Sequence, residues 1–345
     1  MGISYLRGYR DPHRGLRVWS IVARTMPNFL VLRVPMHIPD GWKWLGHGRF
    51  MAFVFKLWGH LLLVARIQKV SHGSILVREF LTWPLLLIAP FLFFKRHSLW
   101  FLCQHNLAFA NVNSGHRVIL RVLRRVGFGF VLFEDASAWN VIEPNAGPLA
   151  NVRSIPLPFQ SEKKETHRRN AGAKLMVGFV GNFRKEKSPI WALEILAKAF
   201  SPQGLLPDCE LLVGSPDAEF RAGCLSYARV IDTGTYASYL AALDACDIVV
   251  LPYDGASYAY RSSGVLAEAL TCGCAVVVPD VPTLRNQVLD PIPIGSCYAD
   301  QSGLIAAVQA AAAIVRSGSF GAVLDAHYAV RGPASVYSAL EGLTK

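Results

Sequence analysis

The stretch Tyr260–Asp280 reads YRSSGVLAEALTCGCAVVVPD and joins a turn of small residues to a short helix and an apolar strand. Ser262, Ser263 and Gly264 can expose backbone N–H groups where the helix begins. The first N–H groups of a helix lack intrahelical partners and attract anions. Glu268 follows about one turn later, where its carboxylate can accept hydrogen bonds from two sugar hydroxyls. The stretch therefore predicts a seat for the phosphate and ribose of a nucleotide diphosphate.

The second half of the chain alternates apolar strands with helices of 3.6-residue periodicity. Strands are predicted over 174–180, 210–213, 229–231, 248–251 and 275–278, and helices over 189–200, 237–245, 263–270 and 304–315. This order predicts a doubly wound parallel sheet, with ligands at the carboxyl ends of its strands.

The first half repeats this rhythm less regularly. Strands are predicted over 29–34, 73–77, 99–103 and 128–133, with a helix over 115–126 that carries four arginines. A chain of 345 residues with this pattern predicts two α/β domains. The polar segment 160–173 lies between the two halves and is the predicted linker.

A second candidate loop follows the strand that ends at Val180. Gly181 and Asn182 begin it, and Arg184 and Lys187 place two cations near the carboxyl edge of the sheet. A glycine lets a ligand approach the backbone, and arginine and lysine both bind phosphate oxygens. The alternative interpretation is a solvated basic turn.

Charge is distributed unevenly along the chain. Residues 1–170 hold 23 Lys and Arg against 8 Asp and Glu, whereas residues 171–345 hold 12 against 16. This asymmetry predicts that the first half faces an anionic partner: nucleic acid, an anionic membrane or a phosphorylated lipid. The seven cysteines show no zinc-like spacing, which favours buried free thiols in a reducing, cytosolic compartment.

Two apolar runs stand out in the first half, at residues 50–66 and 75–94. Charged residues, glycine and prolines interrupt both, so that neither is predicted to span a membrane. Interfacial helices and ordinary buried helices both remain open for these runs.

Three elements of the second half resemble, in this order, the donor domain of GT-B glycosyltransferases. They are Phe179–Lys187 (FVGNFRKEK), Asp247–Tyr253 (DIVVLPY), and Ser263–Leu270 (SGVLAEAL) followed by GCAVV at 273–277. The nearest group is the large retaining one called family 4 or group 1. The resemblance covers residues 174–290 and implies a GT-B fold of two Rossmann-like domains that face each other across a cleft.

The resemblance also implies roles for individual residues. Arg184 and Lys187 would clamp the donor diphosphate beside Gly181 and Asn182, and Glu268 would hold the ribose. The amides of Ser263 and Gly264, next to Ser262, would meet the distal phosphate. The segment Thr233–Tyr236 would line the base, and Tyr253 belongs to the same donor pocket.

Two departures from the family pattern bear on the chemistry. Many relatives place arginine directly after the loop glycine, where this chain has Asn182. Many also carry an acid eight residues before the ribose glutamate, and this chain has Tyr260 there. Retention and inversion of the anomeric configuration therefore both remain open.

Candidate catalytic residues follow two strands of the first half. His105 would hydrogen-bond the donor sugar or the leaving phosphate, and Asp135, next to Glu134, would act as a general base in an inverting reaction. Structural roles are the alternative for each of them.

The sequence predicts a glycosyltransferase that moves a hexosyl group from a UDP- or GDP-sugar to a hydroxyl. We expect an acceptor-binding domain over 1–165, a nucleotide-sugar domain over 172–325, and a C-terminal helix over 326–345 that returns to the first domain. The reaction would need no metal or other cofactor. The acceptor would be a glycan or lipid-linked precursor of a polysaccharide, at the inner face of the cytoplasmic membrane, with no nucleic acid bound. We therefore expect a cytoplasmic enzyme that is peripheral to the inner membrane.

Two alternatives keep part of this interpretation. A GT-B sugar-nucleotide epimerase would retain the phosphate seat. A non-enzymatic anion- or nucleic-acid-binding protein would use the basic half alone, but it lacks the recognised motifs of that class.

Overall fold

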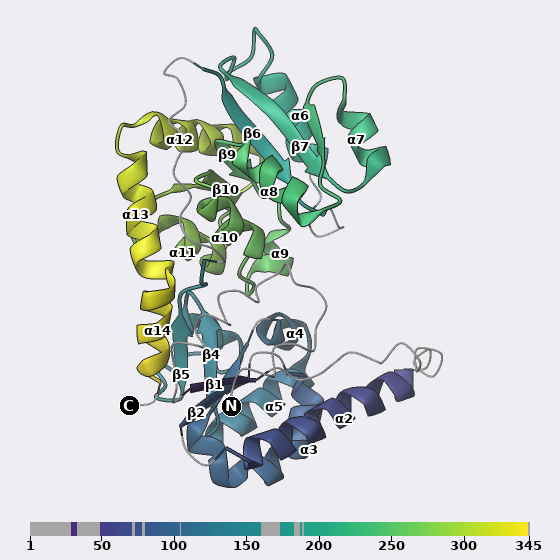
Figure 1. Ribbon diagram of the computed structural model, residues 1–345, viewed down its shortest axis with the longest axis vertical. Helices are drawn as coiled ribbons and strands as arrows, with labels where there is room; N and C mark the ends of the chain where they lie inside the picture. The colour runs from purple at the N-terminus through teal and green to yellow at the C-terminus, as the bar shows by residue number, and fades with distance from the viewer. Residues whose placement is uncertain are drawn as a thin grey trace. The chain divides into compact units, whose positions relative to one another are not determined.

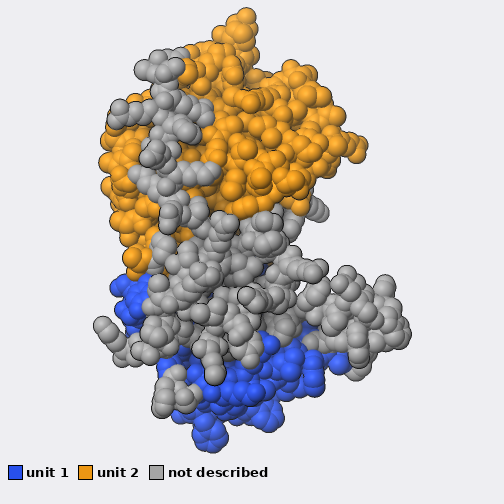
Figure 2. All heavy atoms as spheres, in the orientation of Figure 1, with its two compact units in different colours: residues 1–10, 19–155, 337–345 blue, residues 11–18, 156–336 orange. Residues whose placement is uncertain are grey.

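The computed structural model describes residues 29–32, 49–70, 73–77, 80–103, 105–159, 173–182, 187 and 190–343. These described residues fall into two compact units (Figure 2). One unit holds the residues up to Ile155 together with those from Tyr337 onward, and the other holds Pro156–Val336. The predicted linker at 160–173 lies almost entirely outside the described residues.

The first unit is built on a parallel sheet of five strands in the order β1-β2-β3-β4-β5 (Figure 1). The strands are β1 (Phe29–Leu32), β2 (Ser74–Val77), β3 (Leu99–Leu102), β4 (Gly129–Phe133) and β5 (Val152–Ile155). Every residue of β2, β3 and β4 is buried, as expected for a parallel sheet covered on both faces.

The two apolar runs fall within the strands and helices of this unit. The helices are α2 (Arg49–Gln68), α3 (Thr82–Leu92), η3 (Phe93–Ser98), α4 (Asn106–Val112), α5 (Ser114–Arg125) and η4 (Ala136–Val141). The first run lies within α2, whereas the second is divided among β2, α3 and η3. Among the described residues, no single helix is long and apolar enough to cross a bilayer. One pair of helices, Gln301–Arg316 and Phe320–Glu341, meets the requirement together but is bent by 98°.

Aromatic side chains fill the core of the first unit. The ring of Phe101 meets Phe80 at a centroid distance of 5.3 Å and Phe128 at 5.9 Å, and Phe130 meets Trp139 at 4.9 Å. Such pairs stabilise a core by about 0.5–1.5 kcal/mol each beyond the area they bury.

The arginines of α5 are partly used inside the unit. Glu143 is buried and accepts hydrogen bonds from Arg124, Arg125 and Trp139. Burial alone would raise the pKa of Glu143, but the hydrogen bonds from Arg124 and Trp139 outweigh it and lower the pKa. Arg121 donates to the carbonyl of Ile142 at 2.5 Å. These three cations of the predicted basic helix therefore hold η4 and the chain after it against α5.

The second unit is built on a parallel sheet of six strands in the order β11-β10-β9-β6-β7-β8. The strands are β6 (Leu175–Val180), β7 (Cys209–Ser215), β8 (Arg229–Asp232), β9 (Ile248–Val250), β10 (Ala275–Pro279) and β11 (Gly295–Tyr298). The chain runs outward from β6 to β8 and then crosses back to β9 on the other side of β6. This reversal is a topological switch point between β6 and β9, which is where open α/β sheets bind ligands.

Helices cover both faces of this second sheet. They are α6 (Ile190–Ala199), α7 (Ala218–Cys224), α8 (Tyr236–Asp244), α9 (Gly255–Tyr258), α10 (Gly264–Thr271), α11 (Pro282–Leu289), α12 (Leu304–Arg316) and α13 (Phe320–Arg331), with α14 (Pro333–Glu341) after them. Alternate strand residues enter two separate cores: Val276 packs with α8, α10 and α11, whereas Val277 packs with α6 and α12. The predicted doubly wound domain is confirmed.

Candidate active site

The first element of the site is the carboxyl end of β6. Gly181 has φ +142°, and its N–H donates to the carbonyl of Gly214 at 2.9 Å. A Cβ at Gly181 would meet no atom of the described residues within 4 Å, although Gly181 itself is buried. Asn182 follows and is exposed, whereas Arg184 lies outside the described residues. The described part of this turn, Gly181 and Asn182, lies next to the switch point.

The amino end of α10 is the second element. Ser263 caps this helix, and its hydroxyl accepts from the N–H of Leu266 at 3.2 Å. The N–H of Ser263 itself donates to Oε1 of the buried Gln287 on α11 at 3.1 Å. Gly264 is exposed with open space around it, and Ser262 is half-buried. Of the amides predicted to meet phosphate, that of Ser263 is already engaged, so Gly264 N–H is the better donor.

Glu268 is the third element and lies one turn into α10. Glu268 is 8% exposed and is therefore a buried glutamate and not a surface one. The hydroxyl of Tyr239 on α8 donates to Glu268 Oε2 at 2.5 Å. A buried carboxylate needs such partners, because burying an unpaired charge is costly. Tyr239 thus fixes one oxygen of the predicted ribose ligand.

A stack of side chains joins the loops after β6 and β9 to α10. The ring of Tyr253 lies against that of Tyr258 at 3.9 Å, with an angle of 16° between the rings. Lys187 Nζ lies 5.2 Å from the centre of the Tyr253 ring, within cation–π range. The hydroxyl of Tyr253 is 3.0 Å from the hydroxyl of Ser263, and burial raises the pKa of Tyr253 well above its ordinary value. Three of the predicted donor-site residues, Lys187, Tyr253 and Ser263, are therefore in contact.

The segment predicted to line the base begins α8. Tyr236 stacks on Tyr239 with ring centres 6.0 Å apart and an angle of 24°. Thr233 is buried, and its hydroxyl has no hydrogen-bond partner within the part of the chain that the structure describes. Tyr236 therefore contacts the tyrosine whose hydroxyl binds Glu268.

Asp247 has a structural role. Its carboxylate accepts from the backbone N–H of Met176 at 2.6 Å, and its own N–H donates to the Met176 carbonyl at 2.8 Å. Asp247 therefore fixes the start of β9 against β6. Leu251–Tyr253 follow β9 at the opposite, carboxyl edge of the sheet. Of the sequence element Asp247–Tyr253, it is therefore Tyr253 that lies in the candidate site.

The candidate catalytic residues of the first unit follow the neighbouring strands β3 and β4. His105 is exposed at the start of α4, and Gln104 before it lies outside the described residues. Asp135 caps η4 by accepting from the N–H of Ser137 at 2.7 Å and from its hydroxyl at 2.5 Å. Glu134 before it has a positive φ of 66°. The catalytic roles of His105 and Asp135 stay predictions, and Asp135 already serves as the cap of η4.

Several partners of the site were missed from the sequence. Tyr239 lies one helical turn after Tyr236, and this spacing was the available signal, whereas Tyr258 ends α9. Gln287 lies on α11, which was not predicted. Tyr260 lies half-buried between α9 and α10, in the place of the expected acid. Across the described ranges, no group of three or more His, Cys, Asp or Glu side chains could hold a metal ion.

Comparison with known proteins agrees with this geometry. Residues 174–317 match the family described as glycosyl transferases group 1. A comparison with curated proteins finds no match.

Solved structures resemble the chain at low sequence identity. Anabaena HepE, solved with UDP and glucose, is 13% identical with a TM-score of 0.56 and 93% of each chain covered. TarM is 10% identical with a TM-score of 0.56, covering 85% of this chain and 58% of TarM. The trehalose 6-phosphate synthase of Burkholderia multivorans is 11% identical with a TM-score of 0.56, covering 86% of this chain and 75% of the synthase.

The lengths of these relatives differ from that of this chain. It spans 60% of the matched chain of the GtfA/B complex. The GT-B fold predicted from the sequence is confirmed, and within the second unit residues 174–317 are similar to the group 1 glycosyltransferases.

Proposed function

We propose that the protein transfers a hexosyl group from a UDP- or GDP-sugar to a hydroxyl of a glycan or lipid-linked acceptor. The observation that carries this proposal is the grouping of a phosphate-binding and a ribose-binding group on one short helix at the switch point. Gly264 begins α10 with open space around it, and the buried Glu268 lies on the next turn. A diphosphate needs hydrogen-bond donors and ribose hydroxyls need an acceptor, and α10 offers both.

The diphosphate would lie between the amino end of α10 and the loop after β6. The helix supplies free N–H groups and the positive end of its dipole, and Lys187 supplies a cation held over the Tyr253 ring. Arg184 of the same loop would add a planar fork of donors. These groups stabilise the charge that develops on the leaving diphosphate, so the reaction would require no metal.

The nucleoside would extend from Glu268 toward α8. The carboxylate oxygens of Glu268 accept hydrogen bonds from ribose hydroxyls, while Tyr239 keeps the carboxylate in place. Tyr236, stacked on Tyr239, offers an aromatic face to the base. UDP is the first nucleotide to test, because HepE was solved with UDP-glucose and TarM with UDP and alpha-GlcNAc-glycerol.

In the transfer itself, the bond between the anomeric carbon and the diphosphate oxygen breaks and a bond to the acceptor oxygen forms. The acceptor hydroxyl loses its proton, to Asp135 in an inverting reaction or to the departing phosphate in a retaining one. His105 would hydrogen-bond the sugar or the phosphate. The anomeric configuration of the product, read by NMR coupling constants, distinguishes these two courses.

The first unit would bind the acceptor. The excess of basic residues in residues 1–170 suits an anionic, lipid-linked precursor of a polysaccharide. We infer a cytoplasmic enzyme that works at the inner face of the membrane and does not bind nucleic acid.

The test is a matched pair of substitutions assayed for UDP release from UDP-sugars with a lipid-extract acceptor. Glu268→Gln removes the charge that holds the ribose, and Glu194→Gln removes an exposed charge on α6 of the same unit. We expect at least a tenfold loss of kcat/KM in the first and no change in the second, which corresponds to about 1.4 kcal/mol or more. Equal activities in the two variants would contradict the proposed ribose contact, and conversion of the sugar-nucleotide to an epimer without acceptor would favour an epimerase.

A further inference from the structure

Exposed apolar side chains gather on the first unit. Of the large hydrophobic residues that are exposed in the described chain, fifteen lie in this unit and six in the second. Ten of the fifteen belong to α2, α3 and η3. A patch of this kind on one part of a protein indicates a partner surface.

The helix α3 is apolar around its whole circumference. Its sequence TWPLLLIAPFL has no charged residue. Leu85, Ile88 and Leu92 are buried against the unit, yet the opposite side carries Trp83, Leu87 and Phe91, which are 48%, 51% and 60% exposed. A helix that is hydrophobic all round normally lies in a core or a membrane. The outer side of α3 is therefore available to an apolar environment.

The helix α2 adds a second apolar stripe. Its inner side buries His60, Leu63 and Ile67. Its outer side exposes Trp58 by 60% and Leu61 by 40%, three residues apart and thus on one side of the helix. The outer sides of α2 and α3 therefore both expose aromatic and aliphatic side chains.

Two hydrogen bonds hold α2 and α3 alongside each other in the same direction. The N–H of Leu81, just before α3, donates to Nε2 of His60, and the Gln68 amide at the end of α2 donates to the Phe91 carbonyl at the end of α3. The second bond is exposed, so the outer sides of the two helices adjoin there. Figure 1 shows α2 and α3 side by side. We name this surface the α2–α3 face; it consists of Trp58, Leu61, Leu62, Trp83, Leu87, Phe91 and Phe94.

Basic residues outnumber acidic ones in the sequence that forms and follows this face. From Arg49 to Phe133 the sequence holds eleven lysines and arginines and a single acid, Glu79. Lys56 and Lys69 are exposed on α2, and Arg96 lies 4.0 Å from the centre of the Phe93 ring. An apolar strip with aromatic residues and basic neighbours matches an anionic lipid surface.

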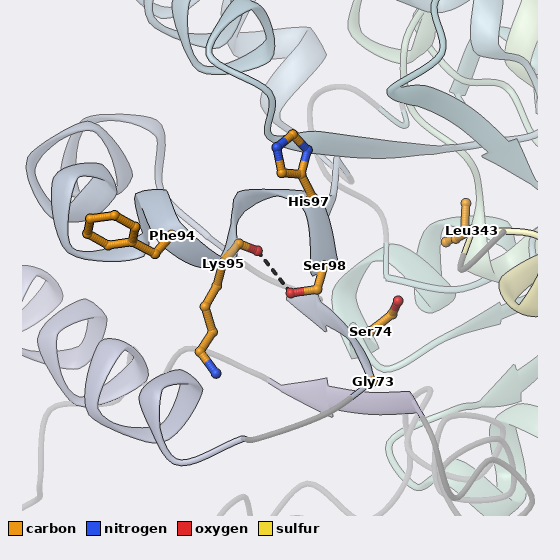
Figure 3. A pocket seen from close by; sticks show the side chains of 7 residues that line it. All are labelled: Gly73, Ser74, Phe94, Lys95, His97, Ser98 and Leu343. Atoms are coloured by element: carbon orange, nitrogen blue, oxygen red, sulfur yellow. Dashed lines mark hydrogen bonds between the residues drawn. The ribbon is translucent and has the colours of Figure 1, made fainter.

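A hollow next to the face offers a place for lipid phosphate. Its volume is about 400 Å³, and Ser74, Lys95, His97 and Ser98 line it together with the most exposed aromatic residue, Phe94, which is 92% exposed (Figure 3). Hydroxyl and ammonium groups are suitable donors to phosphate oxygens. In this structure the Lys95 ammonium also donates to the Val70 carbonyl, and the Ser98 hydroxyl donates to the Lys95 carbonyl. The hollow lies where β2 and β3 begin, whereas His105 and Asp135 follow the opposite ends of β3 and β4. Contact with a surface through this side would leave the edge with His105 open.

We propose that the α2–α3 face lies on an anionic lipid bilayer, with its tryptophan, phenylalanine and leucine side chains at the boundary of headgroups and acyl chains. The cations, Lys95 in the hollow among them, then meet lipid phosphates. This inference rests on the proposed function, because binding to the bilayer would give the enzyme access to a lipid-linked acceptor. Binding to a bilayer is nevertheless a separate property, so that it and donor binding can fail independently.

The test is sedimentation of the full chain with vesicles at low salt. Vesicles of phosphatidylcholine alone are compared with vesicles in which one third of the lipid is phosphatidylglycerol. The test variant is Leu87→Glu with Phe91→Glu. The matched control is Leu205→Glu with Leu225→Glu, which changes two residues of the second unit that are 68% and 64% exposed. Both double variants change the net charge equally, so they differ in the surface altered.

We expect the natural chain and the control to bind the phosphatidylglycerol vesicles, and the α2–α3 variant to bind at least about tenfold more weakly. High salt should weaken binding of the natural chain. Thermal unfolding and the UDP-induced shift of the α2–α3 variant should equal those of the control, which separates this inference from the donor site.

Three results would overturn the inference. The natural chain does not bind phosphatidylglycerol vesicles at low salt, or the two double variants lose binding equally. In the third, the natural chain is a dimer without lipid and Leu87→Glu with Phe91→Glu makes it a monomer, which assigns the face to a second copy of the chain.

Discussion

The hydroxyl of Tyr239 donates a hydrogen bond of 2.5 Å to the carboxylate of Glu268, which is 29 residues further along the chain. This bond joins α8 to α10 across the buried layer that both helices share. Glu268 is also the predicted ribose contact. The position of Glu268 is therefore set by a residue of another helix before any ligand arrives.

Removing the tyrosine hydroxyl should affect both stability and binding. Tyr239→Phe removes a hydrogen bond to a buried carboxylate, and we expect a loss of about 1–3 kcal/mol in the free energy of unfolding. UDP affinity should fall several-fold, because the carboxylate is less well fixed. Urea unfolding and calorimetric titration measure the two effects. Unchanged affinity with the expected loss of stability would mean that Tyr239 serves the fold alone.

Blocking the amino end of α10 should affect binding without affecting the fold. Gly264→Val places a branched side chain at the predicted phosphate seat, in a position where a Cβ meets no atom within 4 Å. Gly321→Val near the start of α13 is the control, since its Cβ also meets no atom within that distance. Both variants should unfold within about 1 kcal/mol of the natural protein. Only Gly264→Val should lose nucleotide affinity, and equal affinities would place the phosphate elsewhere.

Ser263 combines the roles of helix cap and partner of Tyr253. Ser263→Ala removes the acceptor for the N–H of Leu266, and the loss of such a cap costs about 1 kcal/mol. The Tyr253 hydroxyl loses a neighbour in the same substitution. Ser263→Thr keeps the hydroxyl and should restore most of the stability. A melting temperature that falls equally in both variants would show that packing, and not the hydroxyl, is what matters.

Stability should fall with acid through His327. Its Nε2 lies 2.6 Å from the Ile292 carbonyl, and its Nδ1 lies 3.2 Å from a guanidinium nitrogen of the buried Arg331. Nε2 therefore carries the proton and Nδ1 accepts, which is the neutral ring. Burial, opposed by the bond to Ile292 and reinforced by the charge of Arg331, lowers the pKa of His327 from its ordinary 6.5 to about 4.

The unfolded chain binds this proton at higher pH than the folded protein does. Stability is then complete above pH 6.5, falls as pH decreases toward about 4 and levels off below, with a loss of about 3 kcal/mol from this group. Urea unfolding at several pH values should show this slope, and His327→Gln should reduce it. An unchanged slope in that variant would contradict the assignment.

Long periodic segments of the second unit were predictable from the sequence. Its core strands are buried on both sides and read as apolar runs, and α10 has both a capping serine and a following glycine. The strand β11 was missed because GSCY has few apolar residues, although Gly295 is required by the backbone of Val276, 1.9 Å from where its Cβ would lie.

The partners of the site residues were less predictable. A sequence shows that Glu268 follows a helix start, but the bond to Tyr239 depends on how α8 and α10 pack together. Likewise, the N–H of Ser263 donates to the side chain of Gln287, which lies 24 residues further along the chain. In α2 and α3, apolarity alone did not separate buried from exposed sides, because their sequences are apolar on both.

The central claim is that α10 and the loops after β6 and β9 bind a nucleoside diphosphate. The most direct measurement is a thermal-unfolding panel of the full chain with UDP, GDP and ADP, repeated for Glu268→Ala. We predict that one nucleotide, at one hundred times its Kd, stabilises the natural protein by about 2.7 kcal/mol and that the folded variant loses this effect. A folded natural protein that responds to none of the three, or a Glu268→Ala variant that responds equally, would contradict the claim.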